Sequence, residues 1–199
     1  FVDTLHPGKR CTEIFESHGL LTDKCVMEHC VYLEVGDLDT FARKGAGVAC
    51  CPLSNAIFSL SPGWHAFPFH KAHAKGVRVG MGTDIAGGYA ASILVACRHA
   101  AVASKHDMGE KDVDYKDAFW AATLGGARAL GLDAVLGNFE VGKQFDAVRI
   151  NCEAGNYDTF PSAIHPCCPS RLEHDFEKFV NLGDDRNIAS VYVQGKRRR

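Results

Sequence analysis

The sequence has no apolar run that approaches the ~20 residues needed to cross a membrane. Residues 1–11 lack the charged segment followed by an apolar one that would mark a secretion signal. The net charge is −2, so no broad positive field favours a nucleic-acid partner. The basic run at residues 196–199 is interpreted as a solvated tail. We therefore expect neither a membrane nor a nucleic acid among the partners of this chain.

Several catalytic motifs are absent as well. There is no C-x-x-C pair, and no H-x-E followed by P-C-x-x-C, which excludes the nucleobase deaminases built on that zinc motif. Without G-x-S-x-G or a P-loop, nothing supports nucleophile-elbow hydrolysis or phosphate binding. His70 and His73 lie one turn apart on an expected helix, but no carboxylate or cysteine pair adjoins them. They are therefore a poor candidate for a zinc site.

Cysteine occurs in an odd number, nine, which includes the adjacent pairs 50–51 and 167–168. Adjacent cysteines rarely bridge each other, and a chain of 199 residues does not need disulfides to hold its core. This usage is typical of a reduced compartment, so we expect a cytoplasmic protein. Because no Met begins the chain, we also expect it to start within a longer protein.

Short apolar runs alternate with amphipathic stretches over the first two thirds of the chain. The predicted strands are 24–28, 47–52 and 77–84. The predicted helices are 37–46, 68–76, 90–105 and 115–132. The segment 52–55 is predicted as a turn, because Pro52 cannot continue a strand ladder. The alternation favours a parallel sheet with crossover helices, and thus an α/β fold.

From about Gly137 the pattern changes. Strand-like alternation occurs at 147–150 and again at 190–196, whereas 152–169 contains prolines and cysteines and is hard to assign. We interpret the two strands as a small antiparallel element outside the α/β part. The predicted division is therefore an α/β part over residues 1–134, followed by strands and a C-terminal helix or tail over residues 135–199.

Polar side chains follow the ends of the three predicted strands. They are His29, Ser54 with Asn55, and Asp84. In parallel α/β barrels the active site gathers at the carboxyl ends of the strands, so these side chains are candidates for one site. Two structural alternatives stay open: Ser54 or Asn55 caps the helix that follows, and His29 is an interior histidine with a satisfied hydrogen bond.

Asp84 is the strongest candidate of the three. A carboxylate at the end of a buried strand is costly unless a cation or several N–H groups face it. No Lys or Arg adjoins Asp84, since Arg78 lies earlier on the same strand. A metal ion would supply the positive charge. The neighbouring Gly82, Gly87 and Gly88 would let backbone and ligand approach closely.

These residues resemble a known family, the amidohydrolase superfamily. Three segments are similar to the ends of its sixth, seventh and eighth strands: VMEHC (26–30), CPLSN (51–55) and GMGTDIAGG (80–88). Two further segments resemble a helix and a returning strand of its deaminase branch: TLGGARALGL (123–132) and GNFEVGKQFDAV (137–148). Within that branch the likeness is to the guanine deaminases, and it covers about residues 20–196.

The resemblance implies the C-terminal part of a (β/α)8 barrel, strands of a small β-sandwich and a zinc ion. It implies that Asp84 binds the zinc ion and takes a proton from the attacking water, and that His29 orients that water. We expect Asp84 and Asn55 to contact the substrate, a small-molecule purine. The implied reaction is the hydrolysis of guanine to xanthine and ammonia, and the family also implies a homodimer.

The likeness is incomplete at the metal site. No H-x-H occurs, and no H-x-x-E precedes His29; in the family these motifs supply the other zinc ligands and an acid that protonates the purine ring. Cys30 also stands where a small residue is expected. We therefore expect the chain by itself to bind zinc poorly and to be inactive. Two alternatives stay open: a related hydrolase that acts on another aminated ring, and a truncated, non-catalytic interaction segment.

Overall fold

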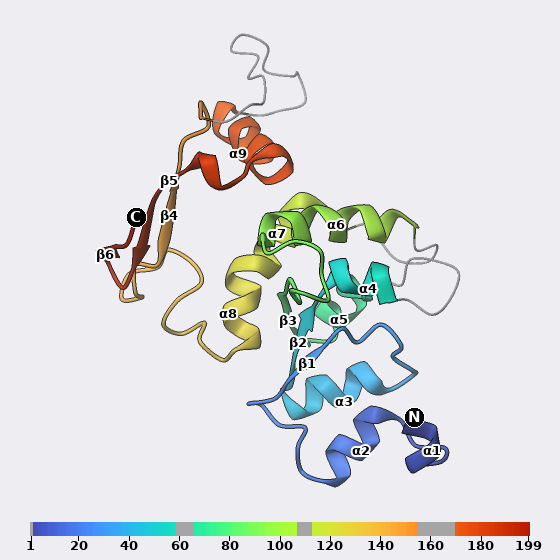
Figure 1. Ribbon diagram of the computed structural model, residues 1–199. Helices are drawn as coiled ribbons and strands as arrows, with labels where there is room; N and C mark the ends of the chain where they lie inside the picture. The colour runs from blue at the N-terminus through green and yellow to red at the C-terminus, as the bar shows by residue number, and fades with distance from the viewer. Residues whose placement is uncertain (1, 59–65, 107–112, 155–169) are drawn as a thin grey trace.

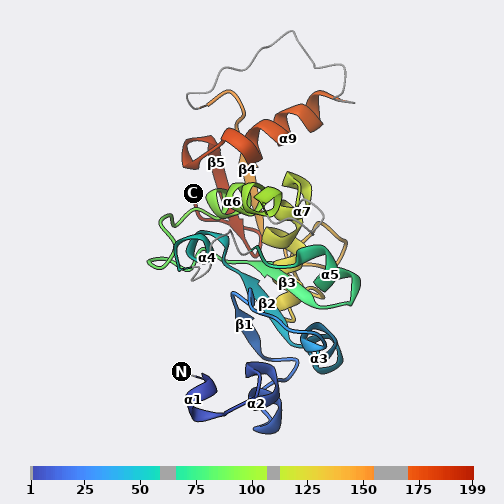
Figure 2. The ribbon, with the colours of Figure 1, turned by 90° about the vertical axis from the view of Figure 1, so that its right-hand side faces the viewer.

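The computed structural model of the chain describes residues 2–58, 66–106, 113–154 and 170–199. A parallel sheet lies at the centre of the larger part, and a separate antiparallel sheet lies on the other side of the helical layer formed by α6 to α8 (Figure 1). The turned view in Figure 2 shows the last long helix, α9, stacked above α6 and α7. Within the described ranges, no helix has the length and apolar character required to cross a membrane.

The central sheet consists of three short parallel strands. They are, in spatial and chain order, β1 (Val26–Glu28), β2 (Gly47–Cys50) and β3 (Arg78–Met81). Val48 pairs with Met27 on one side and with Val79 on the other, and both valines are fully buried. Burial on both faces is the usual state of a parallel strand. The predicted order of parallel strands separated by helices is confirmed.

Three helices connect these strands: α3 (Asp37–Lys44), α4 (Pro52–Phe58) and α5 (Phe69–Ala74). Helix α3 ends at Gly45, whose φ of +66° is the left-handed conformation that glycine favours at a helix end. The prediction of a turn over 52–55 is wrong, because α4 begins at Pro52 itself. Proline suits the first turn of a helix, where its missing N–H costs no hydrogen bond. The loose stretch that precedes α5 lies partly outside the described residues.

The longer helical segments pack over the sheet. They are α6 (Ile93–His106), α7 (Tyr115–Trp120), a π-helical segment (Ala121–Gly125) and α8 (Gly126–Ala129). The helix predicted over 115–132 is thus confirmed, with a π-helical segment in its middle. A Cβ at Gly125 would lie 2.6 Å from the carbonyl oxygen of Val79, and one at Gly47 would lie 2.7 Å from that of Ala129. Glycine at these positions is what lets the helix approach the sheet so closely.

The C-terminal part contains a second sheet of three antiparallel strands. They are β4 (Ala147–Ile150), β5 (Ile188–Val193) and β6 (Lys196–Arg197). The strand predicted at 190–196 begins two residues earlier and ends at Val193; Gln194 and Gly195, with φ angles of 52° and 73°, form the tight hairpin turn that follows. Residues 196–199 are exposed, as predicted for a solvated basic tail, and Lys196 and Arg197 also pair with β5.

Besides α4, three helices were not located from the sequence: α1 (Val2–Leu5), α2 (Cys11–Ser17) and α9 (Arg171–Leu182). Helix α9 begins with a regular cap, in which Ser170 Oγ accepts a hydrogen bond from the backbone N–H of Glu173. The ring of Phe176 meets that of Phe119 edge to face, with centroids 4.8 Å apart. This aromatic contact holds α9 against the helices that cover the sheet.

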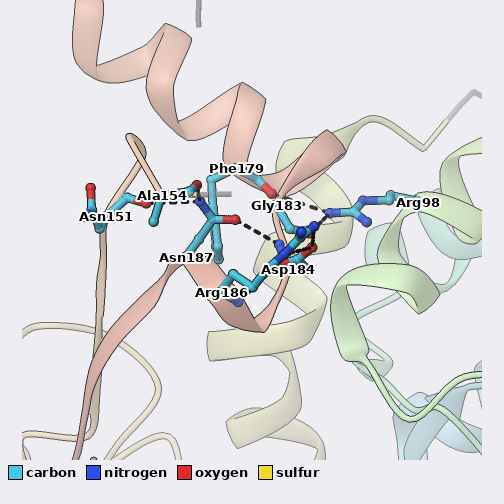
Figure 3. A network of polar contacts seen from close by, with 8 residues as sticks. All are labelled: Arg98, Asn151, Ala154, Phe179, Gly183, Asp184, Arg186 and Asn187. Atoms are coloured by element: carbon cyan, nitrogen blue, oxygen red, sulfur yellow. Dashed lines mark hydrogen bonds and ion pairs between the residues drawn. The ribbon is translucent and has the colours of Figure 1, made fainter. Parts of the chain in front are cut away.

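A polar network joins α9 to α6 and to the antiparallel sheet (Figure 3). Arg98, on α6, donates from Nε to the carbonyl oxygen of Val180 at 2.7 Å, and from Nη2 to that of Gly183. Asn187, which is fully buried, donates to the carbonyl oxygen of Asn151 at 2.9 Å. The two parts of the chain are therefore connected through main-chain carbonyls rather than through ion pairs alone.

Candidate active site

His29 directly follows β1. Its backbone N–H donates to the carbonyl oxygen of Ala49 at 3.0 Å, which extends the sheet by one hydrogen bond beyond the strand. The chain then turns sharply, because His29 and Cys30 both adopt positive φ angles, 64° and 52°. Non-glycine residues in this region are uncommon and cluster at functional sites. The imidazole is 40% exposed, so the alternative of a fully interior histidine is wrong.

Asn55 lies one turn into α4 and is only 7% exposed. Its side-chain Oδ1 lies 2.8 Å from Nδ1 of His29. Because an amide oxygen only accepts hydrogen bonds, Nδ1 is the donor in this contact, and Nε2 is the ring nitrogen that faces Asp84. The alternative that Asn55 caps the helix is wrong, since its side chain is engaged with His29. Ser54 is also inside α4, where its hydroxyl donates to the carbonyl oxygen of Cys51 at 3.1 Å.

Asp84 follows β3 and has a positive φ of 48°. Its Oδ2 lies 3.7 Å from Nε2 of His29, so the two predicted residues meet at one edge of the sheet. A Cβ at Gly87 would lie 2.7 Å from this same oxygen, and a Cβ at Gly88 would overlap the carbonyl oxygen of Thr83. The glycines that flank Asp84 therefore make room for its carboxylate and for the loop that carries it.

Glu28 is a residue of this site to which the sequence analysis assigned no role. One ligand atom each from Glu28, His29 and Asp84 lie within 4.8 Å of one another. Glu28 is the last residue of β1 and is exposed, whereas His29 and Asp84 are half-buried. A signal was present in the sequence, because a carboxylate in the final position of an otherwise apolar strand stands next to the candidate histidine.

Cys51 lies beside this group but is not a nucleophile at neutral pH. Burial, and next the negative charges of Glu28 and Asp84, raise the pKa of its thiol to about 11. A thiol with so high a pKa has almost no thiolate at neutral pH. A Cβ at Gly82 would lie 2.8 Å from its sulfur, so the thiol also packs tightly against the start of the Asp84 loop.

The other histidines that sequence spacing picks out do not gather metal donors. His70 Nε2 lies 3.4 Å from Asp117 Oδ2, and the His73 ring packs edge-on against Trp120 with centroids 4.9 Å apart. Neither belongs to the group of three possible metal donors found within the described ranges. The sequence's one H-x-x-E spacing starts at His174, in helix α9, far from β1 in Figure 1.

Known proteins match this chain over nearly its whole length. The family model described as "Amidohydrolase family" matches residues 2–198. The chain belongs to the amidohydrolase family. Among its relatives in that family, guanine deaminase of Rattus norvegicus is 44% identical over 204 aligned residues, which cover 98% of this chain and 43% of the relative.

Solved amidohydrolase structures superpose well on this chain. E. coli guanine deaminase has a TM-score of 0.80 and 32% identity, with 98% of this chain and 43% of that one covered. A guanine deaminase from C. acetobutylicum, solved with guanine bound in its active site, has a TM-score of 0.80 and 28% identity, with 98% and 44% covered. The chain thus spans less than half the length of the relatives that it matches.

Proposed function

We propose that this chain forms part of the active site of a guanine deaminase, an enzyme that hydrolyses guanine to xanthine and ammonia. The observation that carries the proposal is the meeting of His29 and Asp84 at the carboxyl edge of the parallel sheet. It is supported by the 44% identity to the rat guanine deaminase. The relative solved with guanine in its active site makes guanine the first substrate to test.

The donor atoms fit a zinc ion. Imidazole nitrogen and carboxylate oxygen are both ligands that zinc takes in catalytic sites, and the candidate site offers one of the former and two of the latter within 4.8 Å. We assign Asp84 as a ligand. When bound, the zinc ion acidifies a water molecule, so that hydroxide is available near neutral pH.

Asp84 and His29 then have different roles in the reaction. Asp84 accepts a proton from the attacking water at Oδ2 and passes it to the departing amino nitrogen. Water oxygen bonds to the ring carbon, the bond from that carbon to the amino nitrogen breaks, and ammonia leaves. His29 orients the water through Nε2, which faces Asp84 at 3.7 Å. Asn55 holds the imidazole through Nδ1, and its direct contact with the substrate stays a prediction.

We further propose that β1, β2 and β3 are the sixth to eighth strands of a (β/α)8 barrel within residues 1–134, and that β4 to β6 belong to a β-sandwich within residues 135–199. The parallel order of the first three strands and the antiparallel order of the last three support this division. The H-x-H and H-x-x-E groups of the family would be supplied from outside these residues. A homodimer and a cytoplasmic location stay predictions.

The test uses a chimera in which this chain replaces the matching segment of rat guanine deaminase. Ammonia release from guanine is compared with release from adenine. We expect guanine to be the better substrate, and Asp84→Asn to lower the rate by about 10²- to 10⁴-fold, the usual range for a general acid–base group. Asp133→Asn, which removes a carboxylate that is 46% exposed, is the matched control and keeps the parent rate.

Two results would contradict the proposal. One is a chimera that prefers adenine, which would favour the alternative of another aminated ring. The other is an Asp84→Asn chimera that retains the parent rate. The 199-residue chain is assayed in parallel and is expected to be inactive by itself; strong activity there would refute the division of the site.

A further inference from the structure

The carboxylate of Glu28 has no hydrogen bond or ion pair among the described residues. It is exposed at the last position of β1 and is therefore open to a ligand. Other glutamates of the chain are ion-paired with a lysine or an arginine: Glu13, Glu16, Glu140 and Glu173. Glu28 is thus an acceptor without a protein donor.

This carboxylate lies beside the two residues that the proposed reaction uses. One of its oxygens is within 4.8 Å of a side-chain nitrogen of His29 and of a carboxylate oxygen of Asp84. In the proposed reaction, His29 and Asp84 act on the attacking water and on the departing amino group. Glu28 is therefore close to the carbon that carries this amino group when a substrate is bound.

Two carboxylates this close repel each other unless donors or a cation face them. Asp84 is already assigned to the zinc ion, and its Oδ2 lies 3.7 Å from His29 Nε2. Arg78, on β3, does not serve Glu28, because its guanidinium donates to the carbonyl oxygens of Asp23 and Arg128. An ionised carboxylate only accepts hydrogen bonds, so the group that Glu28 lacks is a donor.

Guanine has two such donors next to the reacting carbon. That carbon is bonded to the amino group and to the ring nitrogen N1, which carries a hydrogen. The amino N–H and N1–H lie side by side, as two N–H groups of a guanidinium do, and a carboxylate accepts such a pair through both of its oxygens. In 2-aminopurine the same ring nitrogen has a lone pair instead, which a carboxylate repels.

We propose that Glu28 is a specificity-determining residue, whose carboxylate accepts hydrogen bonds from N1–H and from the amino group of guanine. The substrate class is then an aminated ring in which the nitrogen next to the amino-bearing carbon carries a hydrogen. Adenine has a lone pair at that nitrogen, which gives a physical reason for a preference for guanine. The inference rests on the proposed function and adds to it a residue that recognises the substrate.

The test measures ammonia release from guanine by the chimera, and the inhibition of that reaction by 2-aminopurine. Glu28→Gln keeps the shape of the side chain but replaces one acceptor with an NH2 donor. We expect kcat/KM for guanine to fall by about 10- to 100-fold, which corresponds to the loss of one hydrogen bond to a charged group. The inhibition constant of 2-aminopurine is expected to fall or to stay the same, because an amide can donate to N1 while it accepts from the amino group.

Two variants and two measurements serve as controls. Glu28→Asp keeps the carboxylate on a shorter stem and is expected to keep the parent's preference for guanine over 2-aminopurine. Glu153→Gln removes an exposed carboxylate outside the site and should behave as the parent does in both assays. Circular dichroism and zinc content are measured for every variant, so that a loss of fold or of metal is distinguished from a change in specificity.

Three results would overturn the inference. The first is a folded Glu28→Gln chimera that acts on guanine as the parent does, or in which guanine turnover and 2-aminopurine binding weaken together. The second is a loss of zinc in Glu28→Gln or of the guanine preference in Glu28→Asp, since recognition of the ring then does not explain the effect. The third is a parent chimera that releases no ammonia from guanine, which overturns the proposed function as well; an active parent separates the two.

Discussion

Removal of the Arg98 guanidinium is expected to detach the C-terminal end of α9 from α6. The last four carbonyls of a helix have no partner within the helix. At the end of α9 the usual left-handed glycine cap is absent, because Gly183 is extended, with φ −68° and ψ 162°. Arg98 supplies the missing donors instead, at the carbonyl oxygens of Val180 and Gly183. A cation at this end also opposes the negative end of the helix dipole.

The magnitude follows from these two hydrogen bonds. A hydrogen bond from a charged group contributes about 1.5–3 kcal/mol. Val180 is 1% exposed, so its carbonyl is left without water when the guanidinium is removed. Since Arg98 is itself only half-buried, we take the lower part of that range for each bond and expect Arg98→Met to reduce the free energy of unfolding by about 3–4 kcal/mol. Arg98→Lys keeps the charge but not the fork of donors, and we expect about half of that loss.

Urea unfolding, followed by circular dichroism, measures both variants against the parent. Arg171→Met is the matched control, because the guanidinium of Arg171 is 74% exposed and its ion pair with Asp175, at 3.6 Å, lies one turn away on α9. Such exposed pairs contribute about 0.3–0.5 kcal/mol. If Arg98→Met costs no more than Arg171→Met, the capping role of Arg98 is refuted.

Two further predictions concern the Asp84 loop and the segment between α9 and β5. In the chimera, Gly87→Ala places a Cβ 2.7 Å from Asp84 Oδ2 and displaces the carboxylate; a shift of this size can cost about 100-fold in rate, and a parent-like ammonia release would contradict it. Hydrogen bonds from the side chain and the backbone N–H of Arg186 lower the pKa of Asp184 from 3.8 to about 2. The ionised form therefore stabilises the fold above pH 3.8, and the stability lost in Asp184→Asn should shrink as the pH falls from 3.8 towards 2. A difference in urea unfolding that is independent of pH would refute this.

The meeting of His29 and Asp84 was predictable from the sequence. Both follow short apolar strands, and the carboxyl ends of parallel strands share one edge of their sheet. The contact between Asn55 and His29 was not predictable in the same way. It depends on α4 starting at Pro52, which puts Asn55 one helical turn from the sheet edge. In a sequence, a proline after a strand is equally typical of a turn. Glu28 was missed because the last residue of a strand at an open edge has no periodic signal.

The backbone of His29 and of Asp84 adopts a conformation that glycine favours. Most of the described positions with positive φ are glycines, such as Gly45 after α3 and Gly195 in the hairpin, and the non-glycine positions are His29, Cys30, Asp84 and Gln194. At His29 and Asp84 the chain keeps side chains at φ 64° and 48°. Such positions cost of order 1 kcal/mol or more each, although glycine would adopt them freely. The imidazole and the carboxylate thus lie 3.7 Å apart at two positions that glycine would adopt at less cost, which supports the catalytic role proposed for them.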